Sequence, residues 1–438
     1  MIKIISKENI LKCAIPIKLV SKYKVHISKD EVIKSNPKIL SQEKESDKNI
    51  HTKSYTENQT LDEGYARSIF KDILDKAVLQ KASDIHIEPF ENLITIRFRI
   101  DGELKKIKEF PMNIYPYLSS VIKLEMSMDI TEKRIPQDGR VDMILNNDEI
   151  DVRASSMPTV YGEKIVLRIL NRNSFLKKKE ELGFSKDAIE KINNMINKNI
   201  GILLITGATG SGKTTTVYSL LNELRYKNKN IMTIEEPVEY KMEGINQTPV
   251  SRKNGISFES GLRSILRQDP DIIMLGEIRD LETAKMAIRA ATTGHLVIST
   301  LHTNDAISSI SRLIDMQIPP YLISESLIGV ISQRLVRKVC PICSKEIVKD
   351  NAITSKVAVG CESCNDGYIG RTAIYEILEI DDNIRESIKQ MNGYKEIKKL
   401  AKTNNMITFE ESAKLLIKDK ITTIEECSIA EKLILVGD

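Results

Sequence analysis

The stretch from Gly201 to Tyr218, GILLITGATGSGKTTTVY, constrains the fold of this chain more than any other part of the sequence. Its first part, Ile202 to Thr206, is an apolar run of strand length. A loop with the pattern G-x-x-x-x-G-K-[ST] follows at 207–214, and apolar residues then recur at helical spacing. Strand, glycine-rich loop and helix therefore come in the order that a nucleotide-binding loop requires.

The composition of this loop is typical of a phosphate site. Glycines let backbone N–H groups approach a phosphate chain closely, and the helix that follows points its positive end at the anion. We expect Lys213 to contact the β and γ phosphates of ATP, and the Thr214 hydroxyl to bind Mg²⁺. The expected ATP-binding residues are Gly207, Ala208, Thr209, Gly210, Ser211, Gly212, Lys213, Thr214 and Thr215.

The length of 438 residues predicts two or three domains. A net charge of +4 does not indicate a nucleic-acid partner, and none is expected. The sequence has no uninterrupted apolar run of about 18 residues, the length a membrane span needs, and its first residues do not resemble a secretory signal. We therefore expect a cytoplasmic protein.

Composition and periodicity divide the chain into four parts. Apolar residues recur at helical spacing through 61–78, and 94–100 (ITIRFRI) alternates strictly, as in a half-buried strand. The region before residue 58 begins with a modestly apolar stretch and continues in polar residues with little to bury. The predicted parts are a short N-terminal segment and flexible linker at 1–57, a small α+β (PAS-like) domain at 58–172, an interdomain linker at 173–182, and a RecA-like α/β ATPase domain at 183–438.

Beyond the loop, three apolar runs end in acidic or polar residues. They are 231–234 before Glu235 and Glu236, 272–275 before Gly276 and Glu277, and 296–300 before His302. In a parallel sheet such strand ends meet at the crevice that holds the nucleotide. Glu277 suits the magnesium shell, either of the two adjacent glutamates suits activation of water, and His302 suits contact with the γ-phosphate. For any one acid a solvated turn is the alternative, and for His302 a structural role.

Two C-x-x-C pairs are separated by seventeen residues, a spacing typical of a four-thiolate zinc site. The alternatives are a redox pair or unrelated buried thiols. Four thiolates leave no open position on Zn²⁺, so the site is expected to be structural. It falls within a predicted zinc module at 338–372, and its ligands are Cys340, Cys343, Cys361 and Cys364.

Several motifs in one order resemble the secretion ATPases of type II secretion systems and type IV pili. The resemblance covers about residues 60–435. The motifs are Val78 to Pro89, RIPQDGR at 134–140, the acidic box IEEPVE at 234–239, LRQDPDIIMLGEIRD at 266–280, and the histidine box GHLVISTLHTN at 294–304. The acidic box departs from the family pattern at Glu236, where aspartate is usual.

The resemblance implies roles for individual residues. Lys213 and Thr214 would bind ATP and Mg²⁺, Glu277 would be the Walker B acid, Glu235 the general base, and His302 would lie near the γ-phosphate. It also implies arginines that complete the site as subunits close. These are Arg134, Arg140 and Arg153 of the smaller domain, and Arg263 and Arg267 of the ATPase domain.

The resemblance further implies a homohexamer that hydrolyses ATP and drives a polytopic membrane platform protein, peripherally associated with the cytoplasmic membrane through its partners. Assembly of a type IV pilus or type II pseudopilus is favoured by the four-cysteine module, which retraction motors generally lack. An adaptor docking on the short N-terminal segment is a further expectation. The alternatives are a retraction or competence-type motor of the same family, a DNA-translocating RecA-like ATPase, and a zinc-binding module on an inactive ATPase. The presence of Lys213 and Glu277 argues against the last.

Overall fold

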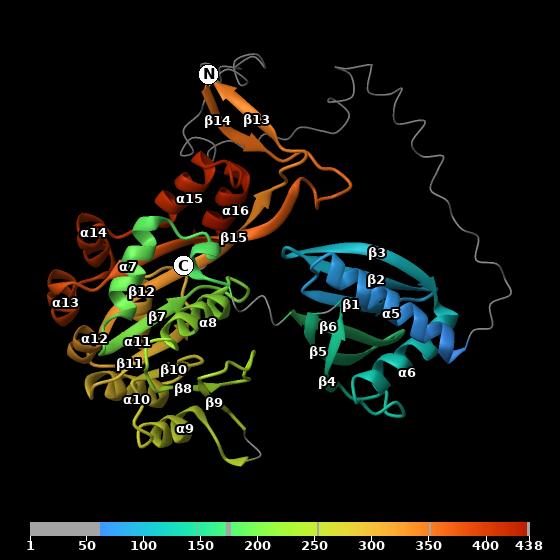
Figure 1. The fold of residues 1–438 in the computed structure, drawn as a ribbon, viewed down its shortest axis with the longest axis horizontal. Coiled ribbons are helices and arrows are strands. Elements are labelled where there is room, and N and C mark those ends of the chain that lie inside the picture. The colour runs from blue at the N-terminus through green and yellow to red at the C-terminus, as the bar shows by residue number, and fades with distance from the viewer. Residues whose placement is uncertain (1–61, 147, 172–176, 252–253, 350–351, 436–438) are drawn as a thin grey trace, which may run out of the picture. The chain divides into compact units, whose positions relative to one another are not determined.

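The computed structural model describes residues 62–438 apart from residues 147, 172–176, 252–253, 350–351 and 436–438 (Figure 1). The N-terminal segment predicted at 1–57 lies outside the described residues, as does the first part of the predicted interdomain linker. Two main sheets organise the described part of the chain. Among the helices of this part, none is both long enough and apolar enough to cross a membrane.

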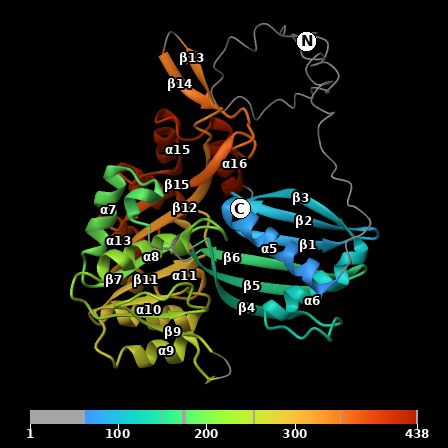
Figure 2. The ribbon, with the colours of Figure 1, turned by 45° about the vertical axis from the view of Figure 1, so that its right-hand side comes forward.

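The first sheet has six strands in the order β3-β2-β1-β6-β5-β4, with every neighbouring pair antiparallel. The strands are β1 (Asp84–Pro89), β2 (Leu93–Ile100), β3 (Glu103–Pro111), β4 (Gln137–Leu145), β5 (Asp148–Thr159) and β6 (Gly162–Asn171). Helices α5 (Glu63–Leu79) and α6 (Tyr115–Glu125), the latter after the short turn η1 (Met112–Ile114), share one apolar core with this sheet (Figure 2). The predicted alternation in β2 is confirmed, because Ile94, Ile96 and Phe98 are all buried in that core.

The second sheet has seven strands in the order β15-β12-β7-β11-β10-β8-β9. The strands are β7 (Gly201–Thr206), β8 (Ile231–Glu235), β9 (Asn246–Pro249), β10 (Ile272–Leu275), β11 (Leu296–Leu301), β12 (Leu327–Val339) and β15 (Tyr368–Glu379). Six of them run parallel, and β15 pairs antiparallel with β12. The predicted α/β class with a parallel sheet is therefore confirmed.

Helices cover both faces of this sheet, so its central strands β7, β10 and β11 are buried on both sides. All six residues of β7 are buried. One apolar cluster joins the sheet to helices on one face, and a second cluster joins it to α7 and α8 on the other. The helices around the sheet are α7 (Lys186–Ile196), α8 (Lys213–Leu224), α9 (Phe258–Ile265), α10 (Leu281–Thr292), α11 (Ser308–Asp315), α12 (Pro320–Ser326), α13 (Asp382–Lys389), α14 (Tyr394–Thr403), α15 (Phe409–Lys418) and α16 (Ile424–Leu435), with the short turn η3 (Lys179–Leu182) before α7.

Local chemistry sets the ends of several of these elements. The Asp280 side chain accepts a hydrogen bond from the Thr283 N–H and caps α10. Gly294, with φ of 111°, follows the end of that helix, where a left-handed residue is easily adopted by glycine. The helix between β10 and β11 is thus fixed in length at both termini.

The region between the two cysteine pairs contains a feature that the sequence analysis missed. Strands β13 (Lys345–Lys349) and β14 (Ala352–Val357) pair antiparallel there and form a separate two-stranded sheet. The apolar residues of this segment do not alternate regularly, so they gave no periodic signal for a strand.

Candidate functional site

The phosphate-binding loop connects the end of β7 to the first turn of α8. Gly207, Gly210 and Gly212 have φ of 140°, 80° and 87°, values that residues with a side chain rarely adopt. The Lys213 amino group donates hydrogen bonds to the carbonyl oxygens of Gly207 at 2.7 Å and Ala208 at 3.0 Å. Burial lowers the pKa of Lys213, and the nearby negative charge of Glu277 opposes this shift. The predicted strand, loop and helix are therefore present, with the lysine lying over its own loop.

Glu277 follows β10 directly after Gly276, and its carboxylate lies between two basic side chains. It forms an ion pair with the Arg279 guanidinium, and its other oxygen lies 3.4 Å from Nε2 of His302. Burial and the charge of Lys213 lower the pKa of His302, while Glu277 raises it. The structure thus brings together Lys213, Glu277 and His302, as the strand-end argument predicts.

Arg279 is a member of this group for which the sequence suggested no role. Besides its contact with Glu277, its guanidinium donates to Oε2 of Glu236 at 3.0 Å. One arginine therefore connects the acid after β10 to the acid after β8. The signal that could have found it is its position two residues after Glu277, on the loop that leaves the same strand end.

Glu235, the last residue of β8, is almost completely buried at 3% exposure. Thr233 Oγ1 and Gln247 Nε2 donate to Oε1 at 2.6 and 3.1 Å, and the Tyr218 hydroxyl donates to Oε2. Burial raises the pKa of Glu235, and these hydrogen bonds oppose the shift. The sequence did not predict the three donors, which come from β8, β9 and α8.

The predicted arginines of the smaller domain pair with acids close to them. Arg134 pairs with Glu132 and is 88% exposed. Arg140 and Arg153 are directly opposite each other on β4 and β5, and both pair with Asp151.

The two predicted arginines of the ATPase domain belong to α9 and the turn after it. Arg263 pairs with Glu259 one turn earlier, and Arg267 donates to the Arg263 carbonyl. Both side chains are exposed. Their role remains a prediction.

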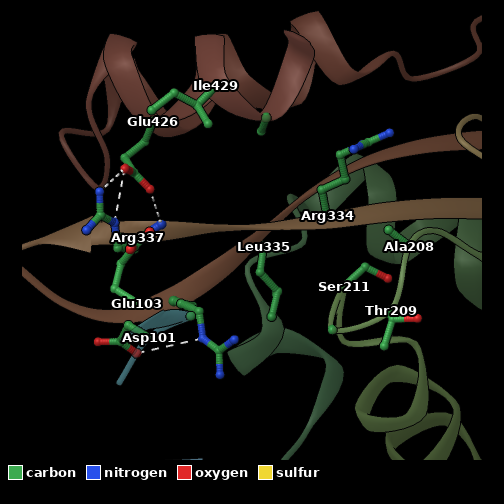
Figure 3. A pocket seen from close by; sticks show the side chains of 14 residues that line it. Asp101, Glu103, Ala208, Thr209, Ser211, Arg334, Leu335, Arg337, Glu426 and Ile429 are labelled. Atoms are coloured by element: carbon green, nitrogen blue, oxygen red, sulfur yellow. Dashed lines mark hydrogen bonds and ion pairs between the residues drawn. The ribbon is translucent and has the colours of Figure 1, made fainter. Parts of the chain in front are cut away.

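A pocket opens beside the phosphate-binding loop (Figure 3). Within residues 177–435, it is lined by parts of the loop, of β12 and of α16, and by Arg371 of β15. Arg337 of β12 and Glu426 of α16 form an ion pair at its edge, 2.5 Å between Nη2 and Oε1. Lining residues from these three elements include Ala208, Thr209, Ser211, Leu335 and Ile429.

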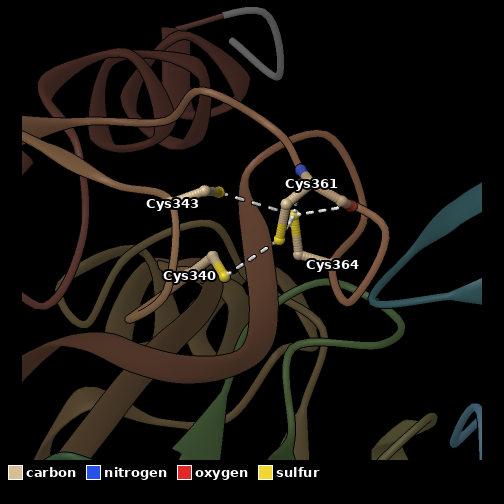
Figure 4. Close-up of side chains that lie close together, drawn as sticks. All are labelled: Cys340, Cys343, Cys361 and Cys364. Carbon is tan, nitrogen blue, oxygen red and sulfur yellow. Dashed lines mark hydrogen bonds between the residues drawn. The ribbon is translucent and has the colours of Figure 1, made fainter.

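The four cysteines of the two C-x-x-C pairs converge on one point (Figure 4). All four sulfur atoms lie within 4.8 Å of one another, and none is in a disulfide. The Sγ atoms of Cys340 and Cys361 are 3.9 Å apart, those of Cys343 and Cys364 3.7 Å, and those of Cys361 and Cys364 3.6 Å. A tetrahedron with zinc–sulfur bonds of about 2.3 Å has edges of about 3.8 Å. The spacing fits one Zn²⁺.

Backbone amides also point at these sulfur atoms. The N–H groups of Gly360, Cys361 and Gly367 donate to cysteine Sγ atoms at 3.1 to 3.3 Å. Such hydrogen bonds favour the thiolate form that binds a metal. The donor set and its surroundings therefore both suit a four-thiolate metal site.

Comparisons with known proteins agree with this geometry. The sequence profile of the family described as "Type II/IV secretion system protein" matches residues 59–429. The chain is 46% identical to the type IV pilus assembly ATPase PilB of Thermus thermophilus, over 84% of this chain and 43% of that protein. It is 44% identical to the type II secretion system protein E of Aeromonas hydrophila, over 81% of this chain and 73% of that protein.

Two solved structures of ATPases are similar to this chain in fold. The pilus retraction motor PilT with bound ADP is 29% identical, with a TM-score of 0.59, over 82% of this chain and 96% of that one. The ATPase DotB of Legionella pneumophila is 24% identical, with a TM-score of 0.63, over 84% of this chain and 96% of that one. The predicted RecA-like fold is confirmed by these neighbours.

The chain spans less than half the length of the Thermus relative and about three quarters of the Aeromonas one. The match to the family covers residues 59–429, which include the phosphate-binding loop, the acidic strand ends and the cysteine cluster. The chain belongs to the Type II/IV secretion system protein family.

Proposed function

We propose that this chain hydrolyses ATP and that hydrolysis powers assembly of a type IV pilus or a type II secretion pseudopilus. The observation that carries the proposal is the convergence of Lys213, Glu277 and His302 at the ends of β7, β10 and β11. A cation at the phosphates, an acid for the metal and a polar side chain for the γ-phosphate are the parts that phosphoryl transfer needs.

Different residues of the chain bind the phosphates, the base and sugar, and the magnesium ion. Backbone N–H groups from Gly207 to Thr215 wrap the phosphates, and Lys213 exchanges its contacts with loop carbonyls for contacts with phosphate oxygens. The pocket beside the loop accepts the base and sugar. Thr214 and Glu277 offer the oxygen ligands that Mg²⁺ prefers, and the ion supplies neutralisation of phosphate charge when bound.

Activation of water is assigned to Glu235, as the family resemblance implies. Its raised pKa moves the carboxylate toward the range in which a general base accepts a proton readily near neutral pH. Tyr218, Thr233 and Gln247 already donate to this carboxylate, which has about four acceptor positions, so about one position is left for a water molecule when ATP is bound.

The wider assignments rest on the family. We assign the active form to a homohexamer, completed by Arg134, Arg140, Arg153, Arg263 and Arg267 as subunits close. Its partner is a polytopic membrane platform protein at the cytoplasmic face of the membrane, and residues 1–57 are available for an adaptor. Cys340, Cys343, Cys361 and Cys364 would hold a structural Zn²⁺, and this module favours assembly over retraction.

Two variants of the site test the proposal. Lys213→Ala should abolish ATP binding, because the phosphates lose their cation. Glu277→Gln should still bind ATP but turn it over at least ~10²-fold more slowly, the scale of one positioned catalytic group. Binding is measured with a fluorescent ATP analogue and turnover by phosphate release.

A matched control is Glu282→Gln, an exposed acid in the first turn of α10 that pairs with Lys285. It should leave both quantities unchanged. Full turnover in Glu277→Gln would show that the acid has been assigned to the wrong residue.

A further inference from the structure

Gln333 lies on β12, the strand beside β7 in the sheet. In the parallel pairing of these strands, Ser332 is opposite Thr206, the last residue of β7. Gln333, the next residue of β12, therefore lies at the level where the phosphate-binding loop leaves the sheet. Its side chain is buried, at 1% exposure.

The side-chain amide of Gln333 bridges the two ends of the loop-to-helix junction. Its Nε2 donates to the Ser211 carbonyl at 2.8 Å, and its Oε1 accepts from Thr216 Oγ1 at 2.8 Å. The carbonyl can only accept, so the nitrogen of the amide must face Ser211. Thr216, in the first turn of α8, is buried as well. Two hydrogen bonds from one buried amide thus connect the loop to the helix.

The contact with Ser211 fixes the direction of a neighbouring N–H group. In a trans peptide the C=O of one residue and the N–H of the next point in opposite directions. With the Ser211 carbonyl held against Gln333, the Gly212 N–H is turned away from β12, toward the side of the loop that wraps a phosphate. Gly212 takes φ of 87° in this arrangement.

Packing leaves the loop little room to move relative to β12. A Cβ atom added at Gly207 would lie 2.4 Å from the Gln333 carbonyl oxygen, and one added at Gly212 would lie 3.0 Å from Nε2. The glycines at both ends of the loop therefore approach the same residue closely.

We propose that Gln333 is a positioning residue of the nucleotide site, which holds the peptide between Ser211 and Gly212 in the orientation that binds phosphate. This inference rests on the proposed function, since it assumes that the loop binds a nucleotide. Gln333 acts through the loop and does not itself touch the ligand.

Gln333→Met tests the proposal in the full-length chain. Methionine has a similar length but makes neither hydrogen bond, so the peptide is free to turn. The dissociation constant for ADP, measured by calorimetry, should rise at least about tenfold, and kcat/KM for ATP should fall in proportion.

The control removes an equally buried hydrogen bond on the other side of β12. Tyr375 of β15 is opposite Gln333, and its N–H donates to Oγ of Ser412 at 3.0 Å. Ser412→Ala should lower the thermal midpoint to an extent similar to Gln333→Met but leave ADP binding within twofold of the parent. ADP binding within twofold of the parent in Gln333→Met, or an equal loss in Ser412→Ala, would overturn the proposal.

A second pair of variants serves if Gln333→Met does not fold. Thr216→Val removes the hydroxyl that holds the Gln333 amide in place and should weaken ADP binding, whereas Thr216→Ser keeps the hydroxyl and should restore it. Equal affinities in these two variants would count against the proposal. If the parent chain itself binds no ADP, the nucleotide-binding function fails, independently of Gln333.

Discussion

Two buried carboxyl groups near the site, Glu235 and Glu376, have raised pKa values for the same reason. Burial is the main cause for both. Glu235 accepts hydrogen bonds from three side chains, whereas Glu376 of β15 accepts from the Ala306 N–H at 3.0 Å and faces the carboxylate of Asp305. The pKa of Glu376 rises from 4.5 to about 7, with Lys398 opposing the shift.

The shift of Glu376 predicts how stability depends on pH. Below about pH 4 the Glu376 carboxyl group is protonated in both the folded and the unfolded chain, so it does not lower the free energy of unfolding. As the pH rises toward 7 the unfolded chain ionises first, and the free energy of unfolding falls by about 3 kcal/mol for the shift from 4.5 to about 7. Glu376→Gln cannot ionise, so its thermal midpoint should gain on that of the parent between pH 5 and pH 8.

The thermal midpoints of Glu376→Gln and of the parent must both be measured at each pH, because other groups titrate as well. The exposed variant Glu282→Gln serves as the reference, since its difference from the parent should not change over this range. A constant difference between Glu376→Gln and the parent at all pH values would mean that Glu376 ionises normally in the folded chain.

At the scale of single elements, the sequence predicts the helices and strands that depend only on the local pattern of apolar and capping residues. The apolar runs that become β7, β10 and β11 are short and fully buried, so their ends, and with them Glu277 and His302, could be placed at one edge of the sheet. Helix α10 carries its own cap at Asp280. The pattern of apolar runs along the sequence is therefore enough to predict where these strands end and which side chains meet there.

The elements that were missed depend on contacts distant in sequence. Strand β12 has polar residues that are buried only because β7 and β15 flank it, and Gln333 acquires its role from a loop more than a hundred residues earlier. The same holds for the donation from Tyr218 to Glu235, which requires α8 to pack beside β8. Periodicity along the chain does not encode such pairings.

The cysteine module gives a prediction at this scale. Its hairpin of β13 and β14 pairs mainly with itself, so metal binding should supply much of the free energy that holds residues 340–364 together. Replacing Cys340 and Cys343 with Ser should release zinc while ATP binding at Lys213 remains. Metal content is measured by plasma mass spectrometry on protein purified under reducing conditions without added zinc.

The parent protein should contain about one zinc per chain, the stoichiometry of a single four-thiolate site. Substantially less zinc in the parent, or an unchanged content in the double Ser variant, would remove the structural-zinc assignment. It would also remove the main reason, drawn from the family resemblance, for choosing assembly over retraction.

At the scale of the whole molecule, the question is what completes the site. The pairs that Arg134 and Arg263 form, with Glu132 and Glu259, are with acids close in sequence, and these guanidinium groups are largely exposed. Surface pairs of this kind contribute little to stability, so exchanging them for phosphate oxygens costs little. In a ring built from head-to-tail contacts, an arginine on one subunit can serve the nucleotide of its neighbour.

A mixing experiment distinguishes action within one chain from action between chains. Lys213→Ala and Arg134→Ala each should have little ATPase activity alone, the first because it binds no ATP and the second because its sites lack the arginine. If Arg134 acts on a neighbour, a Lys213→Ala subunit still supplies an intact arginine to an adjacent Arg134→Ala subunit that binds ATP. With random mixing in equal amounts, half of the chains bind ATP and half of their arginine-donating neighbours are intact, so about a quarter of the parent activity should return in a closed ring.

The activity of the mixture should also increase with protein concentration, as should that of the parent, because both need the assembled ring. Size-exclusion chromatography with light scattering, in the presence of ATP, follows assembly under the same conditions. Activity that stays at the mean of the two separate variants would place Arg134 and Lys213 in the same chain's site, and a strictly monomeric parent with full activity at every concentration would exclude the hexamer. Recovery of activity by a mixture that stays monomeric in light scattering would contradict the ring as well, because an arginine acting between chains requires a stable contact to carry it to the neighbouring phosphate.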